Sequence, residues 1–234
     1  MTANGRMSRR ILHTSDLHLE SFDSSDYYNF EAVINLAVDV KADLLLIAGD
    51  LFENYKVDEN LARLVVEQLA HLPIHVVILP GNHDCLVPGS VYREIDFSKS
   101  ADNVRVFTAL KGETLVFPDL GISIWGKPIA YYDENFFPLR GIPQCQSQEQ
   151  WNIAVAHGYY VDTEPPAFPS LHIRHDEIVA SGQDYIALGH VPVFKCACDE
   201  PVKAYYSGSP SVSGTVAIVD LVDNEEVQIT CHSL

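Results

Sequence analysis

Five short clusters of polar residues, each at the end of an apolar run, contain side chains of the types that bind metal ions. They are Asp16-Leu17-His18, Gly49-Asp50, Gly81-Asn82-His83-Asp84, His157-Gly158 and Gly189-His190. Carboxylate and amide oxygens, combined with imidazole nitrogens, suit divalent cations such as manganese, iron or zinc. The pattern predicts a site for two such cations, built from residues far apart in the sequence.

The first two clusters offer carboxylates and one imidazole. In a strand or at its end, residues two positions apart point the same way, so Asp16 and His18 could bind one cation together. Asp50 follows a glycine at the end of a strongly apolar run, where a carboxylate near the core is costly unless a cation or hydrogen bonds compensate it. A position between two cations would provide that compensation.

The third cluster is the most specific of the five. Asn82 can bind a metal through its amide oxygen, His83 can lie beside a substrate phosphate, and Asp84 can orient the His83 ring and raise its basicity. Considered alone, each cluster also has a plain structural explanation. Asp16 and Asp50 could cap turns, the Gly81 cluster could be a tight turn, and an isolated histidine is more often a core residue. Five clusters in this order argue against separate explanations.

The runs that precede the clusters must position them. These runs are short, apolar and rich in β-branched residues, as buried strands are, and they cover residues 11–15, 44–48, 75–80, 152–156 and 185–188. Ligands of open α/β sheets bind beyond the carboxyl ends of the strands, so the clusters could share one pocket. Helices are expected from Ser25 or Asp26 and from near Asp58 to Pro73. This βαβαβ order predicts parallel strands.

The second half of the chain has a different pattern of short apolar runs and turn residues. Short strands separated by turns with proline and glycine are expected at residues 104–107, 114–117, 121–125, 204–206 and 215–221. Two stacked sheets with helices outside them would accommodate this mixture of elements. No linker or low-complexity tract divides the 234 residues, which favours one domain.

Composition limits the classes of function. The formal net charge is −17, with 32 acidic against 15 basic residues, which disfavours non-specific attraction to nucleic acid. No apolar stretch approaches the roughly 20 residues of a membrane-spanning helix. Five scattered cysteines do not resemble a disulfide framework, so a cytoplasmic location is expected.

The order of the clusters, D-x-H, G-D, G-N-H-D, H-G and G-H, resembles the calcineurin-like metallophosphoesterase superfamily over roughly residues 9–222. The resemblance implies an α/β fold, a four-layer α/β/β/α sandwich of two stacked mixed sheets. Within the superfamily the chain is most similar to DNA-repair exonucleases of the SbcD type. The segments that carry this narrower resemblance are Ala48-Gly49-Asp50-Leu51-Phe52, Pro80-Gly81-Asn82-His83-Asp84, Tyr185-Ile186-Ala187-Leu188-Gly189-His190 and Tyr206-Ser207-Gly208-Ser209-Pro210.

The resemblance also implies roles for the site residues. His83 would be the catalytic acid or charge-stabilising group, with Asp84 behind it, while a metal-bound hydroxide attacks phosphorus in line. Two divalent cations are implied, manganese foremost and iron or zinc as alternatives. One would be held by Asp16, His18 and Asp50, and the other by Asp50, Asn82, His157 and His190.

Two features depart from the pattern of the resembled family. Its last motif is usually G-H-x-H, whose second histidine completes the shell of the first metal, but Pro192 stands at that position. One tight site and one weaker, exchangeable site are therefore expected. SbcD-type nucleases also carry a DNA-binding cap domain after the core, whereas this sequence ends at Leu234. The expected organisation is a disordered N-terminus over residues 1–8 and a single domain over residues 9–234 without the cap.

The expected function is a metal-dependent phosphoester hydrolase, a phosphodiesterase related to DNA-repair exonucleases. Its substrate would be DNA or a nucleotide, and an SbcC-like ATPase is the partner that the resemblance implies. One alternative is a phosphatase or phosphodiesterase for a small nucleotide or other phosphoester, which the negative charge tolerates better. Another is a weakly active or non-catalytic binding subunit, suggested by Pro192. The natural substrate and the oligomeric state stay open.

Overall fold

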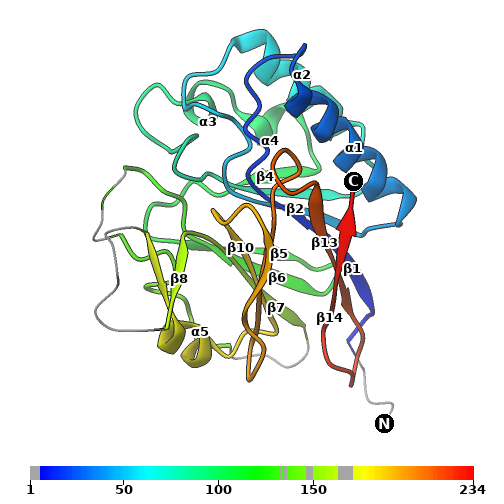
Figure 1. The fold of residues 1–234 in the computed structure, drawn as a ribbon, viewed down its shortest axis with the longest axis vertical. Coiled ribbons are helices and arrows are strands. Elements are labelled where there is room, and N and C mark those ends of the chain that lie inside the picture. Colours follow the sequence, from blue (N-terminus) through cyan, green and yellow to red (C-terminus); the bar gives the residue numbers. More distant parts are fainter. Residues whose placement is uncertain (1–5, 132, 134–135, 146–149, 163–170) are drawn as a thin grey trace.

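Two sheets of six strands each, stacked face to face, form the centre of the fold (Figure 1). The computed structural model describes residues 6–131, 133, 136–145, 150–162 and 171–234. The first sheet has the strand order β14 (Gln228–Ser233), β13 (Thr215–Leu221), β1 (Arg9–Thr14), β2 (Leu44–Ala48), β3 (His75–Leu79) and β4 (Val104–Val106). The second has the order β11 (Phe194–Cys198), β12 (Lys203–Ser207), β10 (Tyr185–Gly189), β7 (Trp151–His157), β6 (Ile122–Gly126) and β5 (Glu113–Phe117).

Both sheets are mixed, with a parallel centre. Strands β1 to β4 run parallel to their neighbours, while β13 is antiparallel to β1 and to β14. In the second sheet, β12, β10, β7 and β6 run parallel, and the edge strands β11 and β5 are antiparallel. The predicted parallel βαβαβ start is confirmed by the β1–β2 and β2–β3 pairings. A separate pair joins β8 (Tyr159–Val161) to β9 (His172–Arg174).

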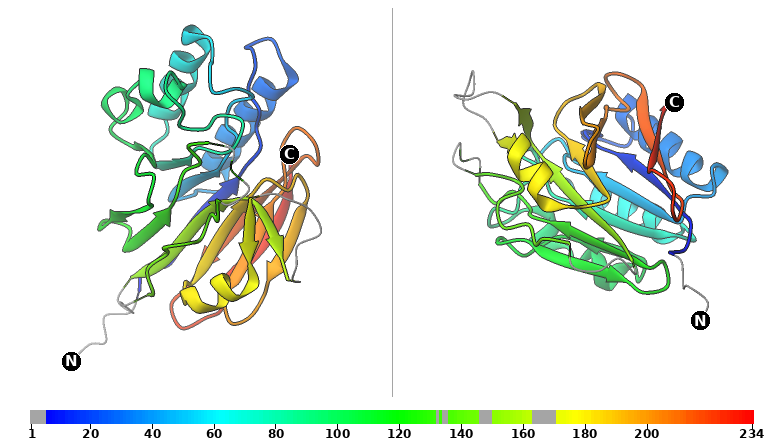
Figure 2. Two further views of the ribbon diagram at one scale, coloured as in Figure 1. Left: turned by 90° about the vertical axis from the view of Figure 1, so that its left-hand side faces the viewer. Right: turned by 90° about the horizontal axis from the view of Figure 1, so that it is seen from below.

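Alternating side chains of the strands divide the core into layers. In β2, Leu45 and Ile47 face a cluster that includes residues of the helices α1 (Ser25–Asp39) and α2 (Glu59–Ala70). Leu44 and Leu46 of the same strand face the second sheet. The outer face of that sheet packs against α5 (His175–Ser181). Figure 2 shows the blue and cyan helices on one side of the sheets and the yellow α5 on the other, which confirms the four-layer α/β/β/α arrangement.

The two long helices, α1 and α2, each begin directly after an N-cap residue. Ser24 caps α1, one residue before the expected start, by accepting a hydrogen bond from the Tyr27 amide. Asp58 caps α2 as predicted and accepts from the amides of Asn60 and Leu61. Two short helices, α3 (Val91–Glu94) and α4 (Phe97–Ser100), follow β3. Among the described residues, none of the helices is both long and apolar enough to cross a membrane.

One strand of the fold differs from the sequence expectations. The sequence does not predict strand β14, because its side chains are mostly exposed and form no apolar run. Its backbone hydrogen bonds to β13 hold it as a strand. A disordered N-terminus was expected over residues 1–8, of which residues 1–5 lie outside the described part. Among the described residues of this segment, Arg6 forms an ion pair of 2.8 Å with Asp184 and stacks on Trp151, whose indole nitrogen donates to the Met7 carbonyl.

Candidate metal centre

The five polar clusters follow or end β1, β2, β3, β7 and β10, and they meet where the two sheets adjoin. The first three clusters come from the first sheet, and the His157 and His190 clusters come from the second. The His190 amide donates to Asp16 Oδ2 at 3.0 Å, and His157 Nε2 lies 3.1 Å from Asp50 Oδ2. The structure therefore brings together residues that the sequence separates by most of its length.

One set of donor atoms surrounds the amide oxygen of Asn82. His157 Nε2 lies 2.9 Å from Asn82 Oδ1, and His190 Nδ1 lies 3.0 Å from the same oxygen. Asp50 and His157 are both buried. Two imidazole nitrogens, an amide oxygen and a carboxylate converge here, which is a donor set that suits a divalent transition metal.

The main chain controls which nitrogen of His157 faces the other donors. His157 Nδ1 lies 2.8 Å from the Ala48 carbonyl oxygen, which can only accept a hydrogen bond, so Nδ1 carries hydrogen and Nε2 faces Asp50. Burial lowers the pKa of His157, but the Asp50 carboxylate outweighs it and raises the pKa to about 9. The same pairing holds the Asp50 pKa well below its usual range, although burial opposes this. A cation bound here would displace the proton that His157 shares with Asp50.

A second set of donor atoms contains Asp16, His18 and Asp50, whose candidate ligand atoms all lie within 4.8 Å of one another. His18 Nε2 faces Asp16 Oδ1 at 3.9 Å. Burial, with a further contribution from the charge of Asp50, raises the pKa of Asp16. Two buried carboxylates that repel each other are costly unless a positive charge lies between them, so these residues fit a divalent cation.

The left-handed backbone conformation of the site residues, and not the alternation of a strand, sets the direction of their side chains. Strand β1 ends at Thr14, and Asp16 and His18 both have φ of 54° in the turn beyond it. Asp50 has φ of 53° and His190 has φ of 94°, so four site residues occupy the left-handed region. A side chain there costs roughly 1–2 kcal/mol, and such residues concentrate at functional sites. The expectation that Asp16 and His18 point the same way because of strand geometry is corrected accordingly.

Hydroxyl groups at the end of β12 and in the segment after it support the turn that carries Asp16. Ser209 Oγ donates to the Asp16 carbonyl at 2.7 Å, and Ser211 Oγ donates to the Leu17 carbonyl at 3.3 Å. Ser207 Oγ lies 3.1 Å from Ser15 Oγ. The Tyr206–Pro210 motif was recognised in the sequence without a role. The structure shows that the Ser209 hydroxyl of this motif, together with Ser211 just beyond it, bonds the backbone of the first cluster.

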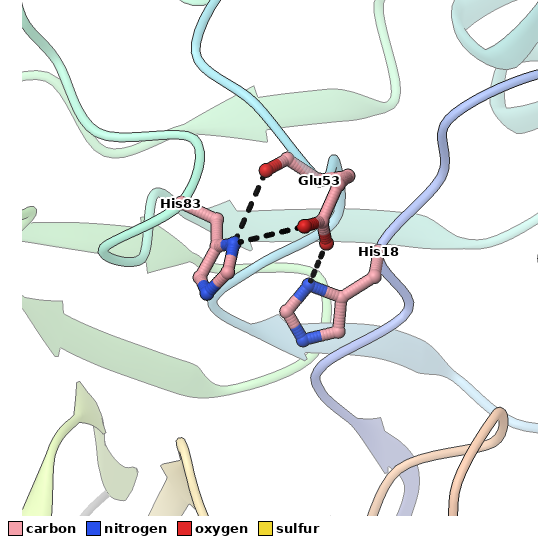
Figure 3. Close-up of side chains that lie close together, drawn as sticks. All are labelled: His18, Glu53 and His83. Carbon is pink, nitrogen blue, oxygen red and sulfur yellow. Dashed lines mark hydrogen bonds and ion pairs between the residues drawn. The ribbon is translucent and has the colours of Figure 1, made fainter.

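Asp84 contacts the surrounding loops and not the His83 ring. Its carboxylate accepts from the amides of Gly81 at 2.7 Å and Phe52 at 3.2 Å, and from the Tyr92 hydroxyl at 2.7 Å. Burial, with the nearby charge of Asp50, raises the Asp84 pKa to about 6. The ring of His83 lies instead against Glu53, which contacts His18 as well (Figure 3).

Glu53 and Tyr92 are functional candidates that the sequence pattern does not single out. Glu53 follows Gly49-Asp50-Leu51-Phe52 directly, so an acidic residue three positions after Asp50 was the available signal. Tyr92 lies in α3, whose four residues show no clear periodicity, and nothing in its sequence context points to Asp84.

Gly49 makes room for the His157 ring, which yields a stability prediction. A Cβ atom at Gly49, where φ is +97°, would overlap His157 Nδ1, whereas at Gly89, where φ is +80°, it would meet nothing within 4 Å. We expect Gly49→Ala to lower the free energy of unfolding by about 2–4 kcal/mol through backbone strain and overpacking together. Gly89→Ala should cost about 1 kcal/mol through strain alone. Denaturant unfolding of both variants measures the difference, and equal losses would contradict it.

Comparison with known proteins gives a consistent family match. A family model described as calcineurin-like phosphoesterase matches residues 9–232. The uncharacterized metallophosphoesterase YhaO of Bacillus subtilis is 27% identical over 221 residues, which covers 85% of this chain and 52% of YhaO. The DNA double-strand break repair protein Mre11 of Methanopyrus kandleri is 25% identical over 211 residues, covering 79% of this chain and 44% of that protein. The chain thus spans about half the length of these relatives.

Solved structures share the fold. The protein TT1561 of Thermus thermophilus superposes with a TM-score of 0.67 at 13% identity, covering 97% of this chain and 99% of the other. A protein described as a novel archaeal phosphodiesterase superposes with a TM-score of 0.53 at 14% identity, covering 96% and 99% of the two chains. At these identities the similarity establishes a shared architecture of sheets and helices.

Proposed function

Because the chain belongs to the calcineurin-like phosphoesterase family and is a metallophosphoesterase of the branch that includes YhaO and Mre11, we propose that it hydrolyses a phosphodiester. The observation that carries the proposal is the meeting of the two sheets at Asp50. His157 from the second sheet lies 3.1 Å from this carboxylate and 2.9 Å from Asn82. The sheets also share a core, which supports a single phosphoesterase domain over residues 9–234.

Six residues are proposed to hold two divalent cations, with manganese favoured and iron or zinc as alternatives. Bound there, the cations would supply Lewis-acid stabilisation of phosphate charge and a water of lowered pKa. Asp50 would serve both cations. The first would be held by Asp16, His18 and Asp50, and the second by Asp50, Asn82, His157 and His190.

His83 is proposed as the acid or charge-stabilising group. Its side chain is 39% exposed, so a substrate phosphate can reach it from solvent. The His83 amide donates to Asp50 Oδ1 at 2.9 Å, which ties its backbone to the centre of the site. A histidine in this position can donate a proton to the leaving oxygen. Asp84 would maintain the loop that presents His83, because it bonds the Gly81 and Phe52 amides.

A panel of three substrates tests the proposal. In the presence of manganese, bis-p-nitrophenyl phosphate should be hydrolysed faster than p-nitrophenyl phosphate, and linear DNA reports nuclease activity. A preference for the monoester would replace the diesterase proposal by a phosphatase. Absence of turnover on all three substrates, despite bound metal, would favour the binding role. The similarity to a DNA double-strand break repair protein supports DNA as the diester. The resemblance to SbcD-type nucleases implies an SbcC-like ATPase as a partner to be sought.

A second candidate is a diesterase or phosphatase for a small nucleotide. The net charge of −17 favours it, because an acidic surface repels a long polyanion more than a small ligand. Hydrolysis of nucleotides with no cleavage of linear DNA, at low and at moderate salt, would select this candidate.

The two cation sites are expected to differ in affinity. The set with Asn82 offers four protein ligands, whereas the set with His18 offers three, because Pro192 cannot bind a metal through its side chain. Titration of the metal-free protein with Mn²⁺ should therefore resolve one tight and one weaker, exchangeable site. Two sites of equal affinity would contradict the expectation. Pro192→His, which offers a further imidazole, should strengthen the weaker site selectively.

A further inference from the structure

We propose that Glu53 is a positioning residue that orients two histidines of the site at once, the proposed metal ligand His18 and the proposed acid His83. The inference rests on the proposed function and adds a residue to it. Glu53 Oε2 lies 2.8 Å from His18 Nδ1, and Oε1 lies 3.6 Å from His83 Nδ1 (Figure 3). The main-chain oxygen of Glu53 lies closer to His83 Nδ1, at 3.1 Å.

The backbone places Glu53 beside His18. The chain segments after β1 and β2 stay paired beyond the ends of the strands: the His18 amide donates to the Asp50 carbonyl at 3.0 Å, and the Glu53 amide donates to the Leu19 carbonyl at 3.2 Å. A parallel bridge joins Leu19 to Phe52. The position of Glu53 is therefore set by the same pairing that carries Asp50 into the site.

The contacts of the two ring nitrogens give His18 a defined orientation. Nε2 faces Asp16 at 3.9 Å, on the side of the proposed cation, and Nδ1 faces Glu53. Although the two atoms are 2.8 Å apart, they form no hydrogen bond as placed, so the ring or the carboxylate must rotate to align one. A carboxylate on Nδ1 favours hydrogen there and leaves Nε2 free to bind a metal, as carboxylate partners of metal-binding histidines do.

Comparison with His157 shows why this contact matters. The Ala48 carbonyl, a main-chain group, holds His157 Nδ1 at 2.8 Å. For His18, the partner of Nδ1 is the side chain of Glu53, which is 41% exposed. The set formed by Asp16, His18 and Asp50 therefore has fewer protein ligands and also depends on a side chain, which is less rigid than a main-chain carbonyl. Glu53 would stabilise metal binding there by reducing the rotational freedom of the ring.

The second contact of Glu53 connects this ligand to the proposed acid. The rings of His18 and His83 lie edge to face, with centroids 4.7 Å apart. Asp84 accepts hydrogen bonds from neighbouring segments, and none of its contacts in the described part of the chain is with the His83 ring. Glu53 is therefore the carboxylate positioned to orient the His83 ring. The Glu53 side chain therefore links His18, a ligand of the proposed weaker metal site, to His83, the proposed acid.

The exposure of Glu53 makes the proposal testable without unfolding the protein. An exposed ion pair contributes little to folding stability, so Glu53→Gln and Glu53→Ala should melt close to the unsubstituted protein. Glu67→Gln on the exposed face of α2 is a matched control for the loss of one surface carboxylate.

The first measurement uses metal-free protein and needs no substrate. At about pH 8.5, long-range ¹⁵N–¹H spectra should show hydrogen on Nδ1 of His18. Glu53→Ala should shift this tautomer toward Nε2, and Glu53→Gln, which keeps an acceptor oxygen, should restore it in part. Titration with Mn²⁺ should show the weaker site losing roughly 10–100-fold in affinity in Glu53→Ala, with the tight site unchanged.

The second measurement is turnover at saturating Mn²⁺ on a dinucleotide, a phosphodiester whose leaving sugar oxygen needs a proton. Glu53→Ala should lower kcat more than it changes KM, and adding Glu53→Ala to His83→Ala should lower kcat no further, because Glu53 would act through His83. Glu67→Gln should match the unsubstituted protein in every readout. Additive losses in the double variant would refute the action through His83.

Three other outcomes decide the proposal. An unchanged His18 tautomer with unchanged Mn²⁺ affinity in Glu53→Ala would overturn it. A third bound Mn²⁺ that is lost in Glu53→Ala would replace it by a cation site formed by His18, Glu53 and His83. An inactive unsubstituted protein would refute the proposed function alone, because the tautomer and the affinity are measured without substrate.

Discussion

Asp50→Asn should lower hydrolysis of bis-p-nitrophenyl phosphate by about a thousandfold or more, because both proposed cation sites use this carboxylate. Loss of one preorganised electrostatic group in an active site typically costs roughly 10²–10³ in kcat. Asp50 is proposed to serve both cations, so both sites would lose a charged ligand in the same variant. Its Oδ1 also accepts from the His83 amide, at 2.9 Å.

The mechanism of that loss can be measured directly. The amide oxygen of asparagine carries no net charge, so bound Mn²⁺ per chain should fall from two toward zero at metal concentrations that saturate the unsubstituted protein. Asp102→Asn is the control, because Asp102 is exposed on the short link between α4 and β4, before the strand begins. It should leave metal content and turnover unchanged. An Asp50→Asn variant that retains both cations and full activity would refute the bridging role.

His83→Ala should lower kcat by about 10²–10⁴-fold while leaving metal content nearly unchanged. This range is typical for removal of a general acid. The side chain of His83 lies outside both proposed donor sets, and its ring nitrogen Nδ1 faces Glu53. The expected separation of turnover from metal binding follows from that placement.

Metal analysis and steady-state kinetics on the same preparation test this separation. His232→Ala, on the edge strand β14, is the control for loss of a histidine outside the site. Equal losses of turnover and of bound metal in His83→Ala would place His83 among the metal ligands. A leaving group that needs no proton should be less sensitive to the substitution, since assistance by an acid then contributes less.

The central strands and the two long helices were predictable because their signals are local. An apolar run such as residues 44–48 defines a buried strand, and Asp58 marks the start of a helix by itself. Strand β14 was not predictable in this way, because its order comes from pairing with β13 and not from its own hydrophobic pattern. The contact of Arg6 with Trp151, which lies far along the chain, likewise has no local signal.

The partners of the charged side chains were less predictable than the strands. Asp84 follows His83 directly, so local chemistry predicted a contact between them. In the structure Asp84 accepts from the Tyr92 hydroxyl and from two backbone amides, and Glu53 lies against the His83 ring. Sequence neighbours in a turn can point in opposite directions, and the turn conformation is decided by contacts made with other segments.

The sequence alone determined the donor types of this protein and their places at strand ends, because apolar runs define strands and polar residues mark where they stop. The family resemblance implied which donors share a cation, but only the tertiary structure decided the contacts that bring them together. Packing of one sheet on the other brings His157 to Asp50, and left-handed backbone at Asp16, His18 and Asp50 turns their side chains into the site. Such contacts depend on distances and dihedral angles that residue order does not contain.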